Sequence, residues 1–367
     1  MKSKITKIVI TGGPCAGKST ALNRIQENFE QLGYTVIFVP ETATELINAG
    51  ISPISCASNL DFQINLFKLQ LQKEKIFSCA ADTMPAEKIL MLCDRGTIDN
   101  KAYMTAEEFA QTIKEIGLSE IELRDSYDAV FHLETTAKGA EDFYTTENNT
   151  ARTETAEQAI EIDNRLISAW TGHPHFRIID NSTDFEGKLK RLNKEIASFL
   201  GEPKPFEIER KFLIEYPDEA LLENNPNCKR VDIIQTYLLS ADGREIRVRQ
   251  RGIQGSYIYF KTEKKYISPT TRIEIEERLT KDEYIALLEK TDAAKAQIRK
   301  SRYCLSSGSF YFEIDIYPFW SNKAIMEIEL SDESQKIIFP DGIKIIKEVT
   351  DDRRYSNSAL ARNHNID

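Results

Sequence analysis

The sequence predicts two domains of different fold class, an α/β domain followed by a mainly β domain. Up to about residue 200, apolar runs typical of buried strands alternate with longer helical patterns, which favours a three-layer arrangement with a parallel sheet between helices. Beyond that point, short alternating runs are separated by turn signals, as in "ADGREIRVRQRG", which favours antiparallel strands with some helix. The length of 367 residues also exceeds what one ordinary domain requires.

The segment "LGEPKPF" separates the two patterns. Gly201, Pro203 and Pro205 resist the continuation of either a helix or a strand. We therefore expect an α/β domain over residues 1–200, a linker over 201–205 and a β domain over 206–367.

Composition limits the classes of partner. The chain has 48 basic and 58 acidic residues, a net charge of -10, which argues against binding nucleic acid or a membrane surface through bulk charge. A polyanion must instead meet a local basic site. Apolar runs fall short of the roughly 18 residues of a membrane span, and the six cysteines have no close-paired spacing. We expect reduced thiols and a cytoplasmic protein without a transmembrane segment.

A phosphate-binding motif lies near the start of the chain. "GGPCAGKST" matches G-x-x-x-x-G-K-[ST] and stands between a strand candidate and a helix candidate, as the motif requires. Backbone N–H groups of such a loop surround phosphate oxygens, the lysine reaches the β- and γ-phosphates, and the hydroxyl ligates Mg²⁺. The predicted nucleotide site comprises Gly12, Gly13, Pro14, Cys15, Ala16, Gly17, Lys18, Ser19 and Thr20. The chain has no clear N-K-x-D guanine signature, which leaves ATP or GTP open and weakly favours ATP or a relaxed choice of base.

Further charged residues are candidates for the same site. Asp94 ends the apolar run "ILML", where a carboxylate can hold the metal. Glu41 ends the strand candidate in "FVPET" and has two equally open interpretations: it orients or deprotonates an acceptor hydroxyl, or it is a helix N-terminal acid. Arg152 and Arg165 flank a stretch that could close over the phosphates, with surface charge as the alternative interpretation.

The first half resembles the nucleotide-kinase-like P-loop proteins over about residues 4–200, on the strength of the glycine-rich loop and of "CDRG", where Arg95 follows Asp94. The resemblance implies a parallel sheet between helices and either nucleotide hydrolysis or phosphoryl transfer. His173 and His175 in "GHPHF" are interpreted as a turn pair rather than metal ligands, because ligand-spaced carboxylates or thiols are missing around them.

In the second half, charged residues recur at every second position. "FEIERKFLI" places Glu207, Glu209 and Lys211 on one side of a strand. Later strands repeat the pattern with Arg247 and Arg249, Lys261, Glu274 and Glu276, Lys300 and Arg302, Glu313 and Asp315, and Glu327 and Glu329.

An ordinary half-exposed sheet would scatter mixed charges over its wet face. Here the charges come in like-signed pairs, and such pairs repel each other unless a cation or a polyanion lies between them. Carboxylate clusters suit Mg²⁺ or Mn²⁺, and basic pairs suit phosphates. We therefore expect a small barrel with a charged interior that binds a metal–phosphate chain.

"EIERK" resembles the ExExK signature of the CYTH domains, the triphosphate tunnel metalloenzymes, and "EVTDDRRYSNSALA" is similar to their usual ending. The resemblance covers about residues 205–362 and implies an eight-stranded antiparallel tunnel barrel. It implies Glu207, Glu209, Glu327 and Glu329 as metal ligands, and Lys211, Arg247, Arg249, Lys261 and Arg302 as triphosphate-binding residues, with Lys211 and Arg302 catalytic. Further candidates are Lys300, which would also bind the triphosphate, Glu276, Asp315 and Arg353.

The whole chain resembles proteins that fuse a P-loop domain to a CYTH domain. This implies an enzyme that binds and hydrolyses a Mg²⁺–nucleotide, or transfers its phosphoryl group, at the first site. At the second site it implies hydrolysis of tripolyphosphate or an organic triphosphate with a divalent metal. Two alternatives stay open: a nucleotide-regulated sensor of polyphosphate or acidic head groups without turnover, and nucleotide cyclisation that yields pyrophosphate. The physiological triphosphate, the acceptor, the oligomeric state, protein partners and coupling between the sites are also open.

Overall fold

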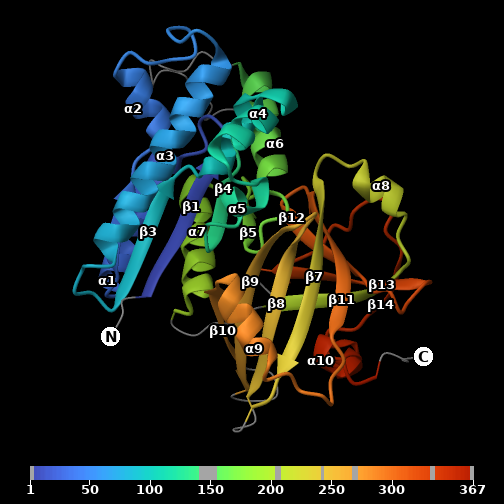
Figure 1. Ribbon diagram of the computed structural model, residues 1–367. Coiled ribbons are helices and arrows are strands. Elements are labelled where there is room, and N and C mark those ends of the chain that lie inside the picture. The colour runs from blue at the N-terminus through green and yellow to red at the C-terminus, as the bar shows by residue number, and fades with distance from the viewer. Residues whose placement is uncertain are drawn as a thin grey trace. The chain divides into compact units, whose positions relative to one another are not determined.

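The computed structural model describes residues 4–139, 155–202, 208–240, 244–266, 272–330 and 335–363 (Figure 1). The chain divides into two compact units, Met1–Asn193 and Lys194–Asp367. The predicted fold class is confirmed, because the first unit holds a parallel sheet with helices and the second an antiparallel sheet. None of the described helices combines the length and apolar character that crossing a membrane requires.

The first unit contains a five-stranded sheet in the order β2-β3-β1-β4-β5 with parallel pairing throughout. Its strands are β1 (Lys4–Gly12), β2 (Thr35–Val39), β3 (Lys88–Asp94), β4 (Ala129–Leu133) and β5 (Phe176–Ile179). Residues 89–93 of β3 are completely buried, which is why this strand is a continuous apolar run rather than an alternating one.

Helices flank this sheet (Figure 1). They are α1 (Lys18–Gln31), α2 (Thr42–Asn48), α3 (Asn59–Ala81), η1 (Thr97–Tyr103), α4 (Ala106–Ile116), α5 (Glu120–Arg124), α6 (Ala156–Trp170) and α7 (Phe185–Leu200). The strand order reverses at β1, which pairs with β3 on one side and β4 on the other. Ligands of open parallel sheets bind at such a reversal, beyond the carboxyl ends of the strands. The glycine-rich loop follows β1 at this position.

The second unit contains an antiparallel sheet in the order β10-β9-β8-β7-β11-β12-β13-β6-β14. Its strands are β6 (Ile208–Glu215), β7 (Cys228–Leu238), β8 (Glu245–Ile253), β9 (Ser256–Tyr266), β10 (Arg272–Leu279), β11 (Ile298–Ser307), β12 (Phe310–Ile316), β13 (Lys323–Leu330) and β14 (Ile345–Glu348). Its helices are α8 (Glu219–Glu223), α9 (Lys281–Leu288), η3 (Arg353–Tyr355) and α10 (Asn357–Leu360). The short β14 beside β6 adds a ninth strand to the eight expected.

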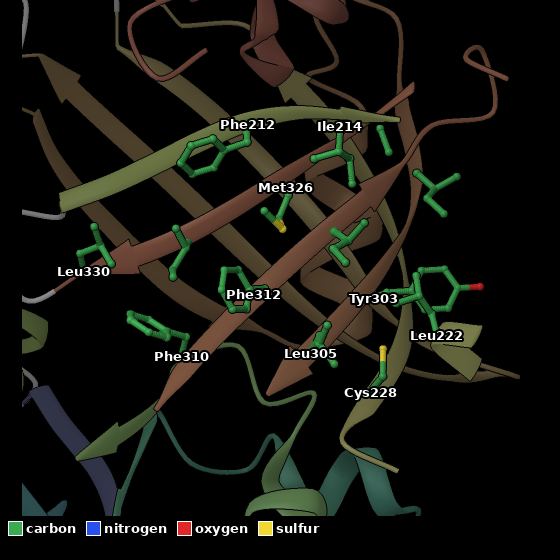
Figure 2. Packing of buried hydrophobic residues seen from close by; sticks show 14 residues of the cluster. Phe212, Ile214, Leu222, Cys228, Tyr303, Leu305, Phe310, Phe312, Met326 and Leu330 are labelled. Atoms are coloured by element: carbon green, nitrogen blue, oxygen red, sulfur yellow. The ribbon is translucent and has the colours of Figure 1, made fainter. Parts of the chain in front are cut away.

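One face of this sheet is apolar. Phe212, Phe312 and Met326 lie in one buried cluster, to which Leu222 of α8 also belongs, beside Tyr303 (Figure 2). A second cluster joins Val248 of β8 to Tyr284 of α9. Because side chains alternate between the faces of a strand, the intervening charged residues must lie on the opposite face.

The strand register confirms that most of the charged residues share this opposite face. Residues directly opposite in an antiparallel pair lie on the same face. From β6 through β13 and β12 to β11, this face is traced by the pairs Glu209–Glu329, Lys211–Glu327, Glu313–Glu327 and Arg302–Asp315. From β11 through β7, β8 and β9 to β10, it is traced by the pairs Ile298–Gln235, Gln235–Arg249, Arg247–Thr262 and Thr262–Glu276. We call it the charged face. Its members are Glu209, Lys211, Arg247, Arg249, Glu276, Lys300, Arg302, Glu313, Asp315, Glu327 and Glu329.

Candidate functional site

The glycine-rich loop runs from the end of β1 to the start of α1. Gly12 has φ 151°, and a Cβ there would lie 2.2 Å from the carbonyl oxygen of Leu133, so only glycine fits. Gly17 caps α1 with φ 87°. The loop therefore ends in the N-terminus of a 14-residue helix, where backbone N–H groups and the helix dipole favour an anion. Ser19 lies exposed in the first turn.

Lys18 and Gly13 make contacts within the protein. The Lys18 ammonium lies 3.2 Å from the Gly12 carbonyl oxygen and 3.5 Å from that of Gly13. The Gly13 N–H donates to Asp163 Oδ1 of α6 at 3.0 Å. This amide therefore anchors the loop to the protein, and Lys18 lies across the loop, from which it can move to a phosphate.

Asp94 ends β3 with one carboxylate oxygen unsatisfied. Its Oδ1 is buried and has no hydrogen-bond partner. Burial raises the pKa of Asp94, and the nearby Lys18 opposes this shift. A buried carboxylate oxygen without a donor fits a Mg²⁺ ligand, because Mg²⁺ prefers hard oxygen ligands.

Glu41 lies at the N-terminus of α2 and forms an ion pair with Arg95. Burial would raise its pKa, but Arg95 and Lys18 outweigh burial and lower the pKa of Glu41 to about 2. The carboxylate also accepts a hydrogen bond from Thr44 at 2.7 Å. Glu41 is therefore ionised and held by partners, which favours a structural acid over a proton acceptor.

Sequence reasoning missed two buried acids of this unit, Asp99 and Asp163. Asp99 accepts hydrogen bonds from the Thr11 hydroxyl and, at 2.6 Å, from the Gly96 N–H. Its carboxylate also lies 3.8 Å from the Arg95 guanidinium, and Arg95 itself has φ 68°. "CDRG" signalled the turn, but only the fold brings Asp99 beneath it.

Other predicted residues of this unit have partners within the protein or lie outside the described residues. Arg165 donates to the Met104 carbonyl oxygen at 2.9 Å, so its guanidinium supports the backbone. Arg152 lies outside the described residues. His173 is buried, and its ring nitrogens lie 3.0 Å from the Tyr127 oxygen and the His175 N–H. Burial lowers the pKa of His173 to about 3, so the ring is a neutral part of a turn.

On the charged face, acids and bases are interleaved. The Lys211 ammonium lies 2.8 Å from Glu327 and 3.4 Å from Glu209. The Arg302 guanidinium contacts Asp315 at 2.7 Å, Glu327 at 3.1 Å and also Glu313. Lys300 forms a further ion pair with Asp315, which is completely buried.

These contacts overturn one expectation. Among the described residues, these like-signed acids do not stay unsatisfied without a guest, because Lys211 of β6 pairs with Glu327 and Arg302 of β11 pairs with both Glu327 and Asp315. Burial would raise the pKa of the half-buried Glu327, yet Lys211 and Arg302 hold this pKa well below the usual range. Lys300 behaves differently: burial and the neighbouring Arg302 lower its pKa to about 8 despite Asp315.

The other half of the charged face is basic. Arg249 lies 3.7 Å from Glu276, which also accepts a hydrogen bond from the Thr262 hydroxyl at 3.1 Å. Arg247 is buried with 8% of its surface exposed, and Arg251, which sequence reasoning missed, with 2%. All three arginines alternate along β8.

Lys261 does not share this face. It pairs with Val248 on β8 and Glu277 on β10, whereas Arg249 pairs with Phe260. The expectation that Lys261 points the same way as Arg247 and Arg249 is therefore wrong. The cause is the two-residue turn at Gln254 and Gly255, which sets Ile253 opposite Ser256 and so fixes which residues of β9 face which residues of β8.

The predicted metal ligands are only partly described. Glu207 lies outside the described residues, as does the side chain of Glu274. Glu209 stands directly opposite Glu329, and like charges in this position repel each other, so a divalent cation fits between them. Within the described ranges, groups of three or more His, Cys, Asp or Glu side chains arranged for a metal are absent.

Comparison with known proteins gives a separate result for each unit. A family model of an AAA domain matches residues 7–188, and a model of the CYTH domain matches residues 205–362. An inorganic triphosphatase of Nitrosomonas europaea is 32% identical over 160 residues, which are 42% of this chain and 96% of that protein. Two crystal structures, one of a hypothetical protein and one of an inorganic triphosphatase, are each 31% identical in sequence to this chain, with a TM-score of 0.31. Each match covers 43% of this chain. It covers 98% of the hypothetical protein and 95% of the inorganic triphosphatase.

Proposed function

The chain belongs to the CYTH family, with a P-loop AAA domain ahead of its CYTH domain, and from this we propose that it is a triphosphatase. In this proposal the CYTH domain hydrolyses tripolyphosphate or the triphosphate group of an organic molecule, with a divalent cation. The relative named inorganic triphosphatase supports it, since the matched region spans 96% of that protein.

The observation that carries the proposal is the sharing of one partly buried sheet face by basic and acidic side chains. A triphosphate chain needs several cationic donors, and Arg247, Arg249, Lys300 and Arg302 supply them from β8 and β11. A cation needs carboxylates, and Glu209, Glu327 and Glu329 supply them from β6 and β13. A purely solvated sheet would not bury Asp315 and Lys300 at 0% and 5% exposure.

The ion pairs suggest how these residues act. Phosphate oxygens compete with Glu327 and Asp315 for Lys211 and Arg302, so substrate binding exchanges one set of charge-assisted hydrogen bonds for another. The carboxylates released from these pairs then become available as ligands. Mg²⁺ or Mn²⁺ held by Glu209, Glu327 and Glu329 would neutralise phosphate charge, and Glu207 is a further ligand by family resemblance. Lys211 and Arg302 would stabilise the negative charge that develops during cleavage.

A matched pair of variants tests this assignment. Arg249→Gln removes a cation from the charged face, and Lys261→Gln removes one from the opposite face of the adjacent strand. We expect Arg249→Gln to raise the KM for tripolyphosphate at least tenfold, on the order of the loss of a charge-assisted hydrogen bond. Lys261→Gln should leave the KM near the wild-type value. Equal effects of the two variants on phosphate release would contradict the proposed binding face.

For the AAA domain we propose Mg²⁺–nucleotide binding, with hydrolysis or phosphoryl transfer as its activity. The support is the loop at the helix N-terminus, Lys18 beside it and the unsatisfied Oδ1 of Asp94. We expect Lys18→Ala to abolish binding of ATP or GTP and to leave tripolyphosphate turnover unchanged. Calorimetric titration of both nucleotides with Mg²⁺ measures the binding and the base preference. Retained nucleotide affinity in Lys18→Ala would contradict the site.

A further inference from the structure

The glycine-rich loop is fixed from behind by residues that no motif includes. Three of its carbonyl oxygens accept hydrogen bonds from side chains outside the loop. The Thr135 hydroxyl donates to the Pro14 oxygen at 2.5 Å and the Thr136 hydroxyl to the Cys15 oxygen at 3.2 Å, while the Lys188 ammonium lies 3.5 Å from the Ala16 oxygen. These partners lie more than 120 residues away in sequence.

The two threonines act where the loop backbone is under strain. Cys15 has φ 58°, in the left-handed region that a side chain other than glycine disfavours. Thr135 holds the peptide group before Cys15 and Thr136 holds the peptide group after it. Both peptide groups flanking the strained residue therefore have their carbonyl oxygens bound to threonine hydroxyls.

Asp163 holds the start of the loop through a backbone N–H group rather than through a carbonyl oxygen. Its Oδ1 accepts the Gly13 N–H at 3.0 Å and the Thr135 N–H at 3.1 Å, so it joins the loop to the threonine segment. Asp163 Oδ1 also lies 3.0 Å from His132 Nε2, and Asp163 Oδ2 accepts a hydrogen bond from the Lys138 ammonium at 2.8 Å. Asp163 is completely buried. A Cβ on Gly13 would lie 2.7 Å from Oδ1, so this contact requires glycine.

We propose that Thr135, Thr136 and Asp163 are positioning residues for the nucleotide phosphates. A carbonyl oxygen that turned toward the site would repel a phosphate, whereas the N–H side of the same peptide attracts it. By holding the peptide groups in one orientation, the three residues preorganise the loop and lower the cost of binding. The inference rests on the proposed nucleotide site of the AAA domain and names which residues outside its motif set the affinity.

The test uses the full chain and a fluorescent ATP analogue with Mg²⁺. Thr135→Val removes the hydroxyl at nearly constant volume, and we expect a roughly three- to tenfold higher Kd, the net value of one hydrogen bond. Thr135→Ser keeps the hydroxyl and should bind like the wild type. The matched control is Thr112→Val in α4, which removes an equally buried hydroxyl that donates to the Glu108 oxygen at 2.8 Å, away from the loop. It should leave the Kd unchanged.

The outcomes separate the two levels of the argument. If wild type binds the analogue and Thr135→Val binds equally well, the positioning role is wrong and the nucleotide site stands. If wild type and Lys18→Ala both fail to bind, the nucleotide site falls and the positioning role falls with it. Should Thr135→Val not fold, Thr136→Val carries the same test at a less buried hydroxyl, and an unchanged Kd there would overturn the inference.

Discussion

Lys300 is a buried base whose charge depends on its surroundings. It is 5% exposed and faces Asp315 and Arg302, with Glu327 nearby and the Tyr317 ring 5.7 Å from its ammonium. Burial, followed by Arg302, lowers its pKa to about 8, while Asp315 and Glu327 act in the opposite direction. The charged form thus becomes the minority form in mildly alkaline solution.

This pKa predicts a pH dependence of triphosphate binding. A bound polyanion favours charged Lys300, so affinity should fall above pH 8, by up to about tenfold per pH unit. Calorimetric titration with tripolyphosphate at pH 7, 8 and 9 measures it. Lys300→Arg stays charged throughout and should flatten the profile. The same slope in both proteins would show that another group titrates.

The same group affects stability with a definite sign. Its folded pKa of about 8 lies below the ordinary value of 10.5, so the unfolded chain binds more protons between these values. The contribution of Lys300 to the free energy of unfolding should therefore increase from pH 8 to pH 10.5. Urea unfolding of wild type and Lys300→Met at pH 8 and pH 10.5 measures this increase in the free energy of unfolding. The variant should lack the part of the increase that Lys300 contributes. An increment of equal size in Lys300→Met would contradict the assignment.

At the scale of elements, the loop between β1 and α1 depends on close packing against α6. Gly13→Ala would place a methyl group 2.7 Å from Asp163 Oδ1 and 2.9 Å from its Cβ, so the loop or α6 must move. We expect at least about a tenfold loss of nucleotide affinity, since the displaced amide loses its hydrogen bond as well. The measurement is the Kd for the fluorescent ATP analogue.

Gly33→Ala is the control for this substitution. Gly33 follows α1 with φ 83°, and a Cβ there has nothing within 4 Å. The variant should lose roughly 1 kcal/mol of stability through backbone strain and keep its nucleotide affinity. If Gly13→Ala behaves like Gly33→Ala in both measurements, the contact with Asp163 does not set the loop geometry.

Element by element, the sequence was informative wherever the chemistry is local. The phosphate loop follows from one contiguous motif, and the charged face from period-two alternation within single strands. The phase of β9 was also accessible, because counting back from the turn at Gln254 and Gly255 places Lys261 opposite Val248. The roles of Thr135 and Asp163 could not be predicted from the sequence, because Thr135 contacts Pro14 across 121 positions and Asp163 contacts Gly13 across 150 positions.

For the whole molecule, the sequence predicted two phosphate-binding domains, and the family matches at residues 7–188 and 205–362 agree with that division. What sequence reasoning could not supply is the state of the charged face without substrate. Like-signed pairs along each strand suggested mutual repulsion, but folding brings opposite charges from β6, β11, β12 and β13 together. These acids are therefore already paired with bases in the folded chain.

The most direct measurement of the central claim is phosphate release from tripolyphosphate by the full chain with Mg²⁺ or Mn²⁺. Wild type and Lys18→Ala should release phosphate at equal rates, because the P-loop site takes no part. Glu209→Gln should lower the rate by at least about a hundredfold, on the order expected when a carboxylate that holds an essential cation is lost. Turnover that survives Glu209→Gln but is lost in Lys18→Ala would contradict the account.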